Sequence, residues 1–131
     1  MKKIILLLML GMAVVSACKK DKSTSTSNKS QEQLLLGKWT LENVGVRNPF
    51  DTPEVINPPS NPSTWDFISL TQIKLNNNTI FDYWLENGEI TIISPGTIPY
   101  VIKTLNETTL IVDYDNFPGG VHVKTTYYFK K

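Results

Sequence analysis

The strongest constraint on the fold is a succession of short β-strand patterns separated by turn residues, which runs from residue 38 to the C-terminus. The clearest signal is Asn87-Gly88, which lies between the apolar segments 83–85 and 90–93. An Asn-Gly pair in this setting predicts a two-residue type I′ hairpin, because both turn positions require a positive φ angle. This region is therefore expected to form hairpins rather than helices.

Seven strands are predicted on this basis, each bounded by turn residues such as Asn76-Asn77-Asn78 and Pro95-Gly96. Their expected ranges are 38–46, 66–75, 79–85, 90–93, 98–105, 110–114 and 121–129. Short links join them, which favours an antiparallel meander over crossover connections. The predicted fold class is all-β: a meander of about seven to eight strands that closes into a small barrel or sandwich.

A short helical turn is expected just before the first strand. Ser30 can serve as the N-cap and Gln33 occupies the capping-box position three residues later. The segment 31–36 then ends at Gly37, a typical helix stop. This allows one or two turns of helix.

Residues 47–63 are the exception to the short links. They contain five of the eight prolines, namely Pro49, Pro53, Pro58, Pro59 and Pro62. Proline removes a backbone donor, so this segment cannot be a central strand. A loop of this length is either a functional lid over the barrel end or a loosely ordered connection, and both interpretations stay open.

The N-terminus has the order of a secretory signal. Lys2 and Lys3 precede twelve uncharged residues, 4–15, which end at the small residues Ser16 and Ala17. The apolar core is short for a membrane-spanning helix, which needs about 20 residues. Residues 1–17 are thus expected to be a signal peptide; an uncleaved anchor is the alternative.

Val15-Ser16-Ala17-Cys18 resembles the lipobox of bacterial lipoproteins. That resemblance implies cleavage before Cys18 and lipid attachment to its thiol and new amine, which would anchor the chain to a membrane. Cys18 is the only cysteine, so an internal disulfide is excluded and lipidation, rather than a leftover free thiol, explains it. The expected location is the cell envelope, at the outer membrane, with its periplasmic or surface face left open.

Charge is divided between two regions. Residues 19–30, the expected flexible tether of segment 18–30, carry a net charge of +3 and no apolar residue, whereas residues 31–131, the expected domain, carry seven basic and eleven acidic residues, a net of −4. An acidic domain lacks the positive surface that nucleic-acid binding requires. Nucleic acid is therefore excluded as an expected partner.

Gly37-Lys38-Trp39, at the start of the first strand, resembles the opening motif of lipocalins and of compact bacterial lipocalin-like domains. The resemblance implies a lipocalin-like β-barrel whose tryptophan closes one end against the helical turn. It also implies a small, partly apolar ligand, held among Trp39, Tyr83 and Tyr127 under the 47–63 loop. Trp65 is a further candidate for the ligand mouth, although packing of that loop onto the barrel is the favoured interpretation.

The alternative is a solid barrel. A small barrel can be filled by its own side chains. The residues available for this are Trp39, Phe67, Phe81, Tyr83, Tyr114, Tyr127 and Phe129. The domain would then be a structural or interaction module that docks onto another cell-envelope protein.

No catalytic or metal site is predicted. His122 is the only histidine, and strand alternation places it on the solvent face with Lys124. No zinc ligand set can be assembled without further His or Cys. Asp113 and Asp115 lie opposite the apolar face of their strand and are expected to be solvated. We therefore expect a binding protein without a cofactor rather than an enzyme; ligand identity and oligomeric state are left open.

Overall fold

The chain was analysed as a computed structural model, in which residues 29–48 and 52–131 are described. Within these ranges it forms nine strands, an α-helix and a 3-10 helix. In chain order they are α1 (Gln31–Leu35), β1 (Gly37–Arg47), β2 (Val55–Asn57), β3 (Thr64–Phe67), β4 (Gln72–Leu75), β5 (Thr79–Glu86), β6 (Glu89–Ile93), β7 (Ile98–Leu105), β8 (Thr109–Asn116), η1 (Pro118–Gly120) and β9 (Val123–Lys130). In this part of the chain no helix combines the length and hydropathy needed to span a membrane.

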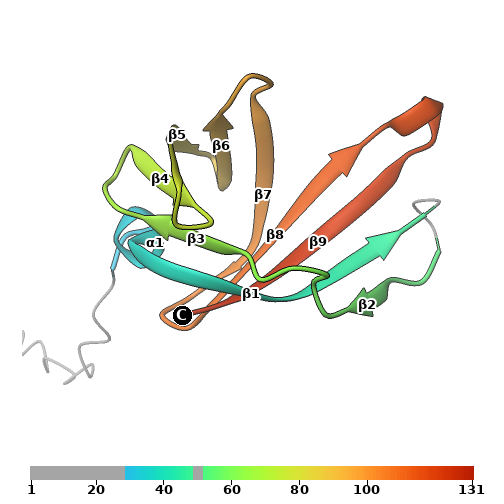
Figure 1. The fold of residues 1–131 in the computed structure, drawn as a ribbon, viewed down its shortest axis with the longest axis horizontal. Helices are drawn as coiled ribbons and strands as arrows, with labels where there is room; N and C mark the ends of the chain where they lie inside the picture. Colours follow the sequence, from blue (N-terminus) through green and yellow to red (C-terminus); the bar gives the residue numbers. More distant parts are fainter. Residues whose placement is uncertain (1–28, 49–51) are drawn as a thin grey trace, which may run out of the picture.

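The strands close into a barrel of eight. From β3 to β9 each strand pairs antiparallel with the next, and β1 pairs with both β3 and β9, which joins the two ends of the sheet. The ninth strand, β2, adds to the free edge of β1 beyond β3. Figure 1 shows α1 beside one end of the barrel. The predictions of an all-β fold, a small closed barrel and a short N-terminal helix are confirmed.

One predicted strand, 66–75, is in fact two. The chain turns between β3 and β4, where the backbone amides of Ile68 and Ser69 both donate to the carbonyl of Gln72, at 3.1 and 3.3 Å. Ile68 and Leu70 are exposed in this turn. In the sequence this turn looks like a continuing strand, because Ile68 and Leu70 alternate with polar residues where the chain leaves the sheet.

The predicted Asn turns are confirmed. Asn87 and Gly88 have φ angles of 50° and 77°, and Glu86 pairs with Glu89 on either side of them. Asn76 and Asn77, between β4 and β5, also lie in the left-handed region with φ angles of 52° and 60°. Asparagine tolerates this conformation better than other residues with a side chain.

The end of the barrel beside α1 is sealed by Trp39. Ser30 and Gln33 form the predicted capping box, which starts α1. The indole N–H of Trp39 donates to the carbonyl of Leu35 at 2.7 Å, so the tryptophan packs directly under the helix. Lys131 covers the ring with its ammonium group 4.6 Å from the ring centroid and donates to the carbonyl of Leu34 at 2.9 Å.

The core fills the barrel with aliphatic and aromatic side chains from almost every barrel strand. Its buried members are Leu35, Trp39, Leu41, Trp65, Phe67, Ile73, Tyr83, Ile90, Ile92, Leu110, Val112 and Phe129. They alternate with outward residues along each strand, as a half-buried sheet requires. A barrel of eight strands is just wide enough for its own side chains to fill it.

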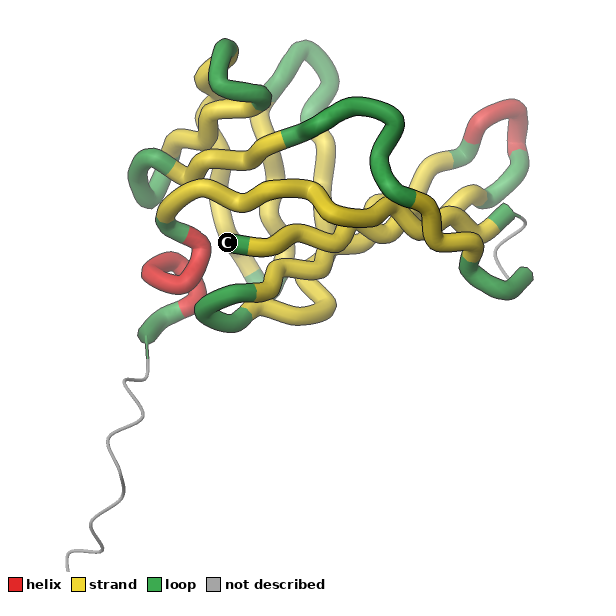
Figure 2. Tube along the Cα trace, turned by 60° about the horizontal axis from the view of Figure 1, so that its bottom comes forward, coloured by secondary structure: helices red, strands yellow, loops and turns green. Residues whose placement is uncertain are grey.

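Beyond the barrel, the strands continue as a projecting arm. We define the arm as residues 44–47 of β1, all of β2, residues 113–116 of β8 and residues 123–127 of β9, with η1 at its tip (Figures 1 and 2). On β1, β3 pairs only with residues 37–40, so the rest of this edge of β1 is open to β2. The proline-rich segment 47–63 contributes no central strand, as expected, but the loop predicted there contains the short edge strand β2.

Candidate functional site

The predicted site residues Trp39 and Tyr83 have structural positions. Trp39 is fully buried at the closed end of the barrel. Tyr83 is 3% exposed, and its hydroxyl donates to the carbonyl of Ser69 in the turn between β3 and β4, at 3.1 Å. Burial raises the pKa of Tyr83. Neither side chain offers a surface to a ligand.

Trp65 lies among the buried aromatic side chains inside the barrel. Its ring centroid lies 4.6 Å from that of Phe129 and 4.8 Å from that of Tyr100. The ring is buried, and Phe67 is a further ring neighbour at 6.3 Å between centroids. Trp65 is thus a core residue, and the two expectations for it, ligand contact and packing of the proline-rich loop onto the barrel, stay predictions.

Tyr127 belongs to a cluster with Tyr100 and Tyr114, which we call the tyrosine cluster. Tyr127 and Tyr114 lie two residues beyond Phe129 and Val112 on the same inner faces, toward the arm. The ring of Tyr100 is 5.6 Å from that of Tyr114 and 6.0 Å from that of Tyr127. All three residues are half-buried.

Burial in this cluster changes the pKa of two of its hydroxyl groups, those of Tyr100 and Tyr127. Burial, together with the nearby Tyr127 and Tyr114, raises the pKa of Tyr100 to about 12. Burial and Tyr114 likewise raise the pKa of Tyr127. Tyr100 and Tyr127 are therefore neutral at physiological pH, and their hydroxyl groups can donate or accept hydrogen bonds beside the buried aromatic rings.

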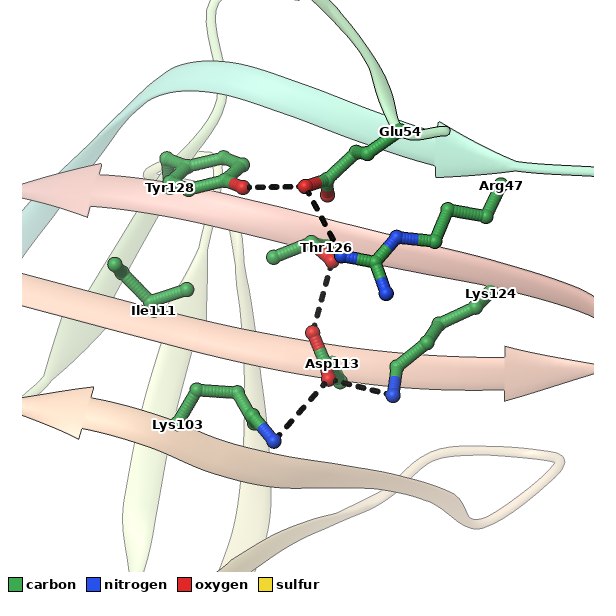
Figure 3. A pocket seen from close by; sticks show the side chains of 8 residues that line it. All are labelled: Arg47, Glu54, Lys103, Ile111, Asp113, Lys124, Thr126 and Tyr128. Carbon is green, nitrogen blue, oxygen red and sulfur yellow. Dashed lines mark hydrogen bonds and ion pairs between the residues drawn. The ribbon is translucent and has the colours of Figure 1, made fainter. Parts of the chain in front are cut away.

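A separate pocket of about 240 Å³ lies on the outer face of the sheet, at the root of the arm. We call it the outer pocket. It is lined by Arg47, Glu54, Lys103, Ile111, Asp113, Lys124, Thr126 and Tyr128 (Figure 3). Strand alternation places it opposite the core, because Thr126 and Tyr128 flank the inward residue Tyr127.

Two carboxylates organise the outer pocket. Asp113 accepts a hydrogen bond from the hydroxyl of Thr126 at 2.8 Å and pairs with Lys124 at 2.9 Å and with Lys103 at 4.0 Å. The expectation that Asp113 is a solvated surface residue was wrong, since it is buried. Its neighbours on β7 and β9 cover it and supply the donors that compensate its lost hydration.

Glu54 closes the pocket from the segment that precedes β2. Its Oε2 accepts from the hydroxyl of Tyr128 at 3.0 Å and pairs with Arg47 at 3.5 Å. Burial and this hydrogen bond raise the pKa of Tyr128. The carboxylate lies over Gly45, where a Cβ atom would clash with it, so glycine is required for this approach.

His122 and Asp115 lie at the far end of the arm. The imidazole of His122 stacks on Phe117 with 4.5 Å between ring centroids, and its Nε2 lies 3.6 Å from Asp115 Oδ1. His122 is half-buried by this stacking, whereas full exposure was expected. Among residues 29–48 and 52–131, no three His, Cys, Asp or Glu side chains gather as a metal site would require.

Sequence reasoning missed Tyr100 and the outer pocket. Tyr100 could have been found, because Ile98, Tyr100 and Ile102 alternate along a predicted strand. The outer pocket depends on which residues of β1, β7, β8 and β9 stand side by side, and a single sequence does not contain that register. The expected lipid attachment site, Cys18, lies outside the described residues.

Comparison with known proteins gives little further information. No protein-family model matches the chain, and no curated protein matches it. Among solved structures, it is similar to a deswapped triple mutant of bovine odorant-binding protein, with 18% sequence identity and a TM-score of 0.42 over 75% of this chain and 74% of that one. The fold itself is shown by the closed strand pairing of this chain.

Proposed function

We propose that this chain is a lipid-anchored binding protein of the cell envelope whose barrel takes a small, partly apolar ligand at the tyrosine cluster. The half-buried state of Tyr100, Tyr114 and Tyr127 carries the proposal. The cluster adjoins the buried rings of Trp65 and Phe129, and its members supply aromatic rings and hydroxyl groups. Apolar sites with a few polar groups are typical of small-molecule recognition.

The ligand class follows from this chemistry. Aromatic rings favour a planar or ring-shaped partner, which they contact by offset or edge-on packing. The hydroxyl groups of the cluster favour a partner with one or two hydrogen-bonding groups, such as a hydroxyl or a carbonyl. A charged head group finds no opposite charge among these three residues.

The test is titration of the full-length chain, in neutral detergent, with the uncharged fluorescent probe N-phenyl-1-naphthylamine. Saturable binding is expected, with quenching of Trp65, whose ring lies 4.8 Å from Tyr100. Tyr127→Leu and Tyr128→Leu form a matched pair, because these neighbours on β9 face the inside and the outside of the barrel. Only Tyr127→Leu should weaken binding; equal affinity in the two variants would refute the site.

The second candidate is an interaction module that docks onto another cell-envelope protein. The observation in its favour is that Trp65, Phe67 and Phe129 fill the centre of the barrel, while Val55 and Ile56 are exposed on the edge strand β2. An exposed edge can accept a further strand from a partner. A photo-crosslinking residue at position 56 should then trap one defined envelope protein in cells, and a crosslink pattern identical to that from exposed Glu42 on β1 would exclude this docking.

A further inference from the structure

The outer pocket combines a built cavity with an excess of positive charge. Three of the seven Lys and Arg residues of segment 31–131 line it, namely Arg47, Lys103 and Lys124. They face two carboxylates, so the lining carries a net charge of +1 in a domain whose net charge is −4. The overall charge of the domain therefore does not account for this local reversal.

Two of the three positive groups are also the accessible ones, whereas the side chain of Lys124 is 17% exposed. The side chains of Lys103 and Arg47 are 54% and 39% exposed, whereas those of Asp113 and Glu54 are 8% and 15% exposed. Asp113 is already occupied by Thr126 and Lys124, and Glu54 Oε2 by Tyr128. A molecule that enters the pocket thus meets N–H donors before it meets carboxylate oxygens.

Two backbone features give the pocket its shape. Lys103 sits at a register shift in β7, since Ile102 pairs with Val112 and Thr104 pairs with Ile111. Such a bulge redirects a side chain, and here Lys103 lines the pocket at 4.0 Å from Asp113, too far for a direct hydrogen bond. Gly45 provides the second feature, because its missing Cβ admits the carboxylate of Glu54 as a wall.

We propose that the outer pocket binds a small anion, a carboxylate or a phosphate, through Lys103 and Arg47. Arg47 has five N–H donors, and the distance from its Nη2 to Glu54 Oε2 is long at 3.5 Å, which leaves donors for a bidentate interaction with an anion. Ile111 and Tyr128 offer a short apolar wall for the rest of the ligand. This site faces away from the tyrosine cluster and is independent of the function proposed for it.

Isothermal titration of the full-length chain in neutral detergent, at low ionic strength, tests the proposal with inorganic phosphate and with acetate as separate probes. Saturable binding of either probe supports an anion site, and the stronger one identifies the head group. Backbone amide NMR shifts should be confined to residues around Asp113 and Lys124. Binding of neither probe, or equal binding of chloride, would overturn the proposal.

Matched variants separate a binding site from general charge attraction. Lys103→Gln should weaken phosphate binding about tenfold, as expected for loss of one charge-assisted contact. Lys130→Gln removes the same charge from the outer face of β9 outside the pocket and should leave affinity unchanged. Equal weakening in both variants would reduce the effect to bulk electrostatics.

A further pair separates binding from a purely structural ion-pair network. Asp113→Asn frees Lys103 and Lys124 from their shared carboxylate, so phosphate should bind several-fold more tightly. Arg47→Gln should weaken binding and, because this side chain is partly exposed, preserve the fold. A network that only holds the arm in place would show no change of affinity in either variant.

Discussion

Tyr100 is the residue whose acid–base chemistry the fold changes most. It lies between Trp65 beneath and Tyr114 and Tyr127 beside it, and burial in this setting raises its pKa to about 12. A phenolate at this position would lose hydration and repel the neighbouring phenolates. Tyr100 is therefore held in its neutral form over the whole physiological range.

This pKa predicts an alkaline loss of stability. An unfolded tyrosine ionises near pH 10, whereas Tyr100 in the folded chain ionises at about 12. Unfolding therefore releases a proton above pH 10, so the stabilisation is complete below that pH and is lost as the pH rises toward 12. Urea unfolding midpoints at pH 8 and pH 11 should differ less in Tyr100→Phe than in the wild type; an equal difference would contradict the assignment.

Asp113 carries a second prediction. Asp113→Asn leaves the partly buried Lys124 without its carboxylate and should lower the free energy of unfolding by about 1–3 kcal/mol. Asp115→Asn, on the same face of β8 but exposed, should change it by less than about 0.5 kcal/mol. Chemical denaturation of the two variants measures the difference, and similar losses would mean that the Asp113 pairs contribute nothing specific.

For single residues, the sequence predicts whether a side chain points into or out of the barrel. It does not predict which residues of other strands lie beside it. Alternation along single strands places Tyr83, Tyr127 and Val112 inward, and the structure agrees. The burial of Asp113 depends on Thr126 and Lys103, which come from other strands. A lone carboxylate opposite an apolar face is solvated by default, and only the spatial neighbours change that.

At the scale of elements, turns with a fixed chemistry were predictable and turns without one were not. Asn87-Gly88 specifies its hairpin through the positive φ angles that both residues adopt. The turn between β3 and β4 has no Gly or Pro, and Ile68 and Leu70 make it resemble a strand. Because this turn was not recognised, seven strands were predicted, whereas the barrel has eight.

The hairpin gives a prediction with an internal control. Gly88→Ala places a Cβ at a φ angle of +77° and should lower the free energy of unfolding by about 1 kcal/mol. Gly96, in the turn between β6 and β7, has open space around it and no positive φ. Gly96→Ala should be neutral or stabilise slightly, and thermal unfolding of the two variants should move apart accordingly.

For the whole molecule, the barrel divides its surfaces by chemistry. The end beside α1 is sealed by Trp39 and Lys131, the inner face toward the arm carries the tyrosine cluster, and the outer face at the root of the arm carries the outer pocket. Strand count and the Gly37-Trp39 motif were enough to predict the barrel. The arm was not predictable, because it results from how far β1, β8 and β9 extend past β3.

The predicted lipid anchor on Cys18 gives the last test, and it concerns the chain as a whole. In bacteria grown with labelled palmitate, the wild-type chain should take up label and lose residues 1–17, which mass spectrometry of the new N-terminus would detect. Cys18→Ser removes the only thiol, so label and cleavage should both disappear. Ser23→Ala, just beyond the lipobox, should behave like the wild type. Label that persists in Cys18→Ser would place the lipid elsewhere, whereas cleavage without label would make the protein a soluble secreted barrel.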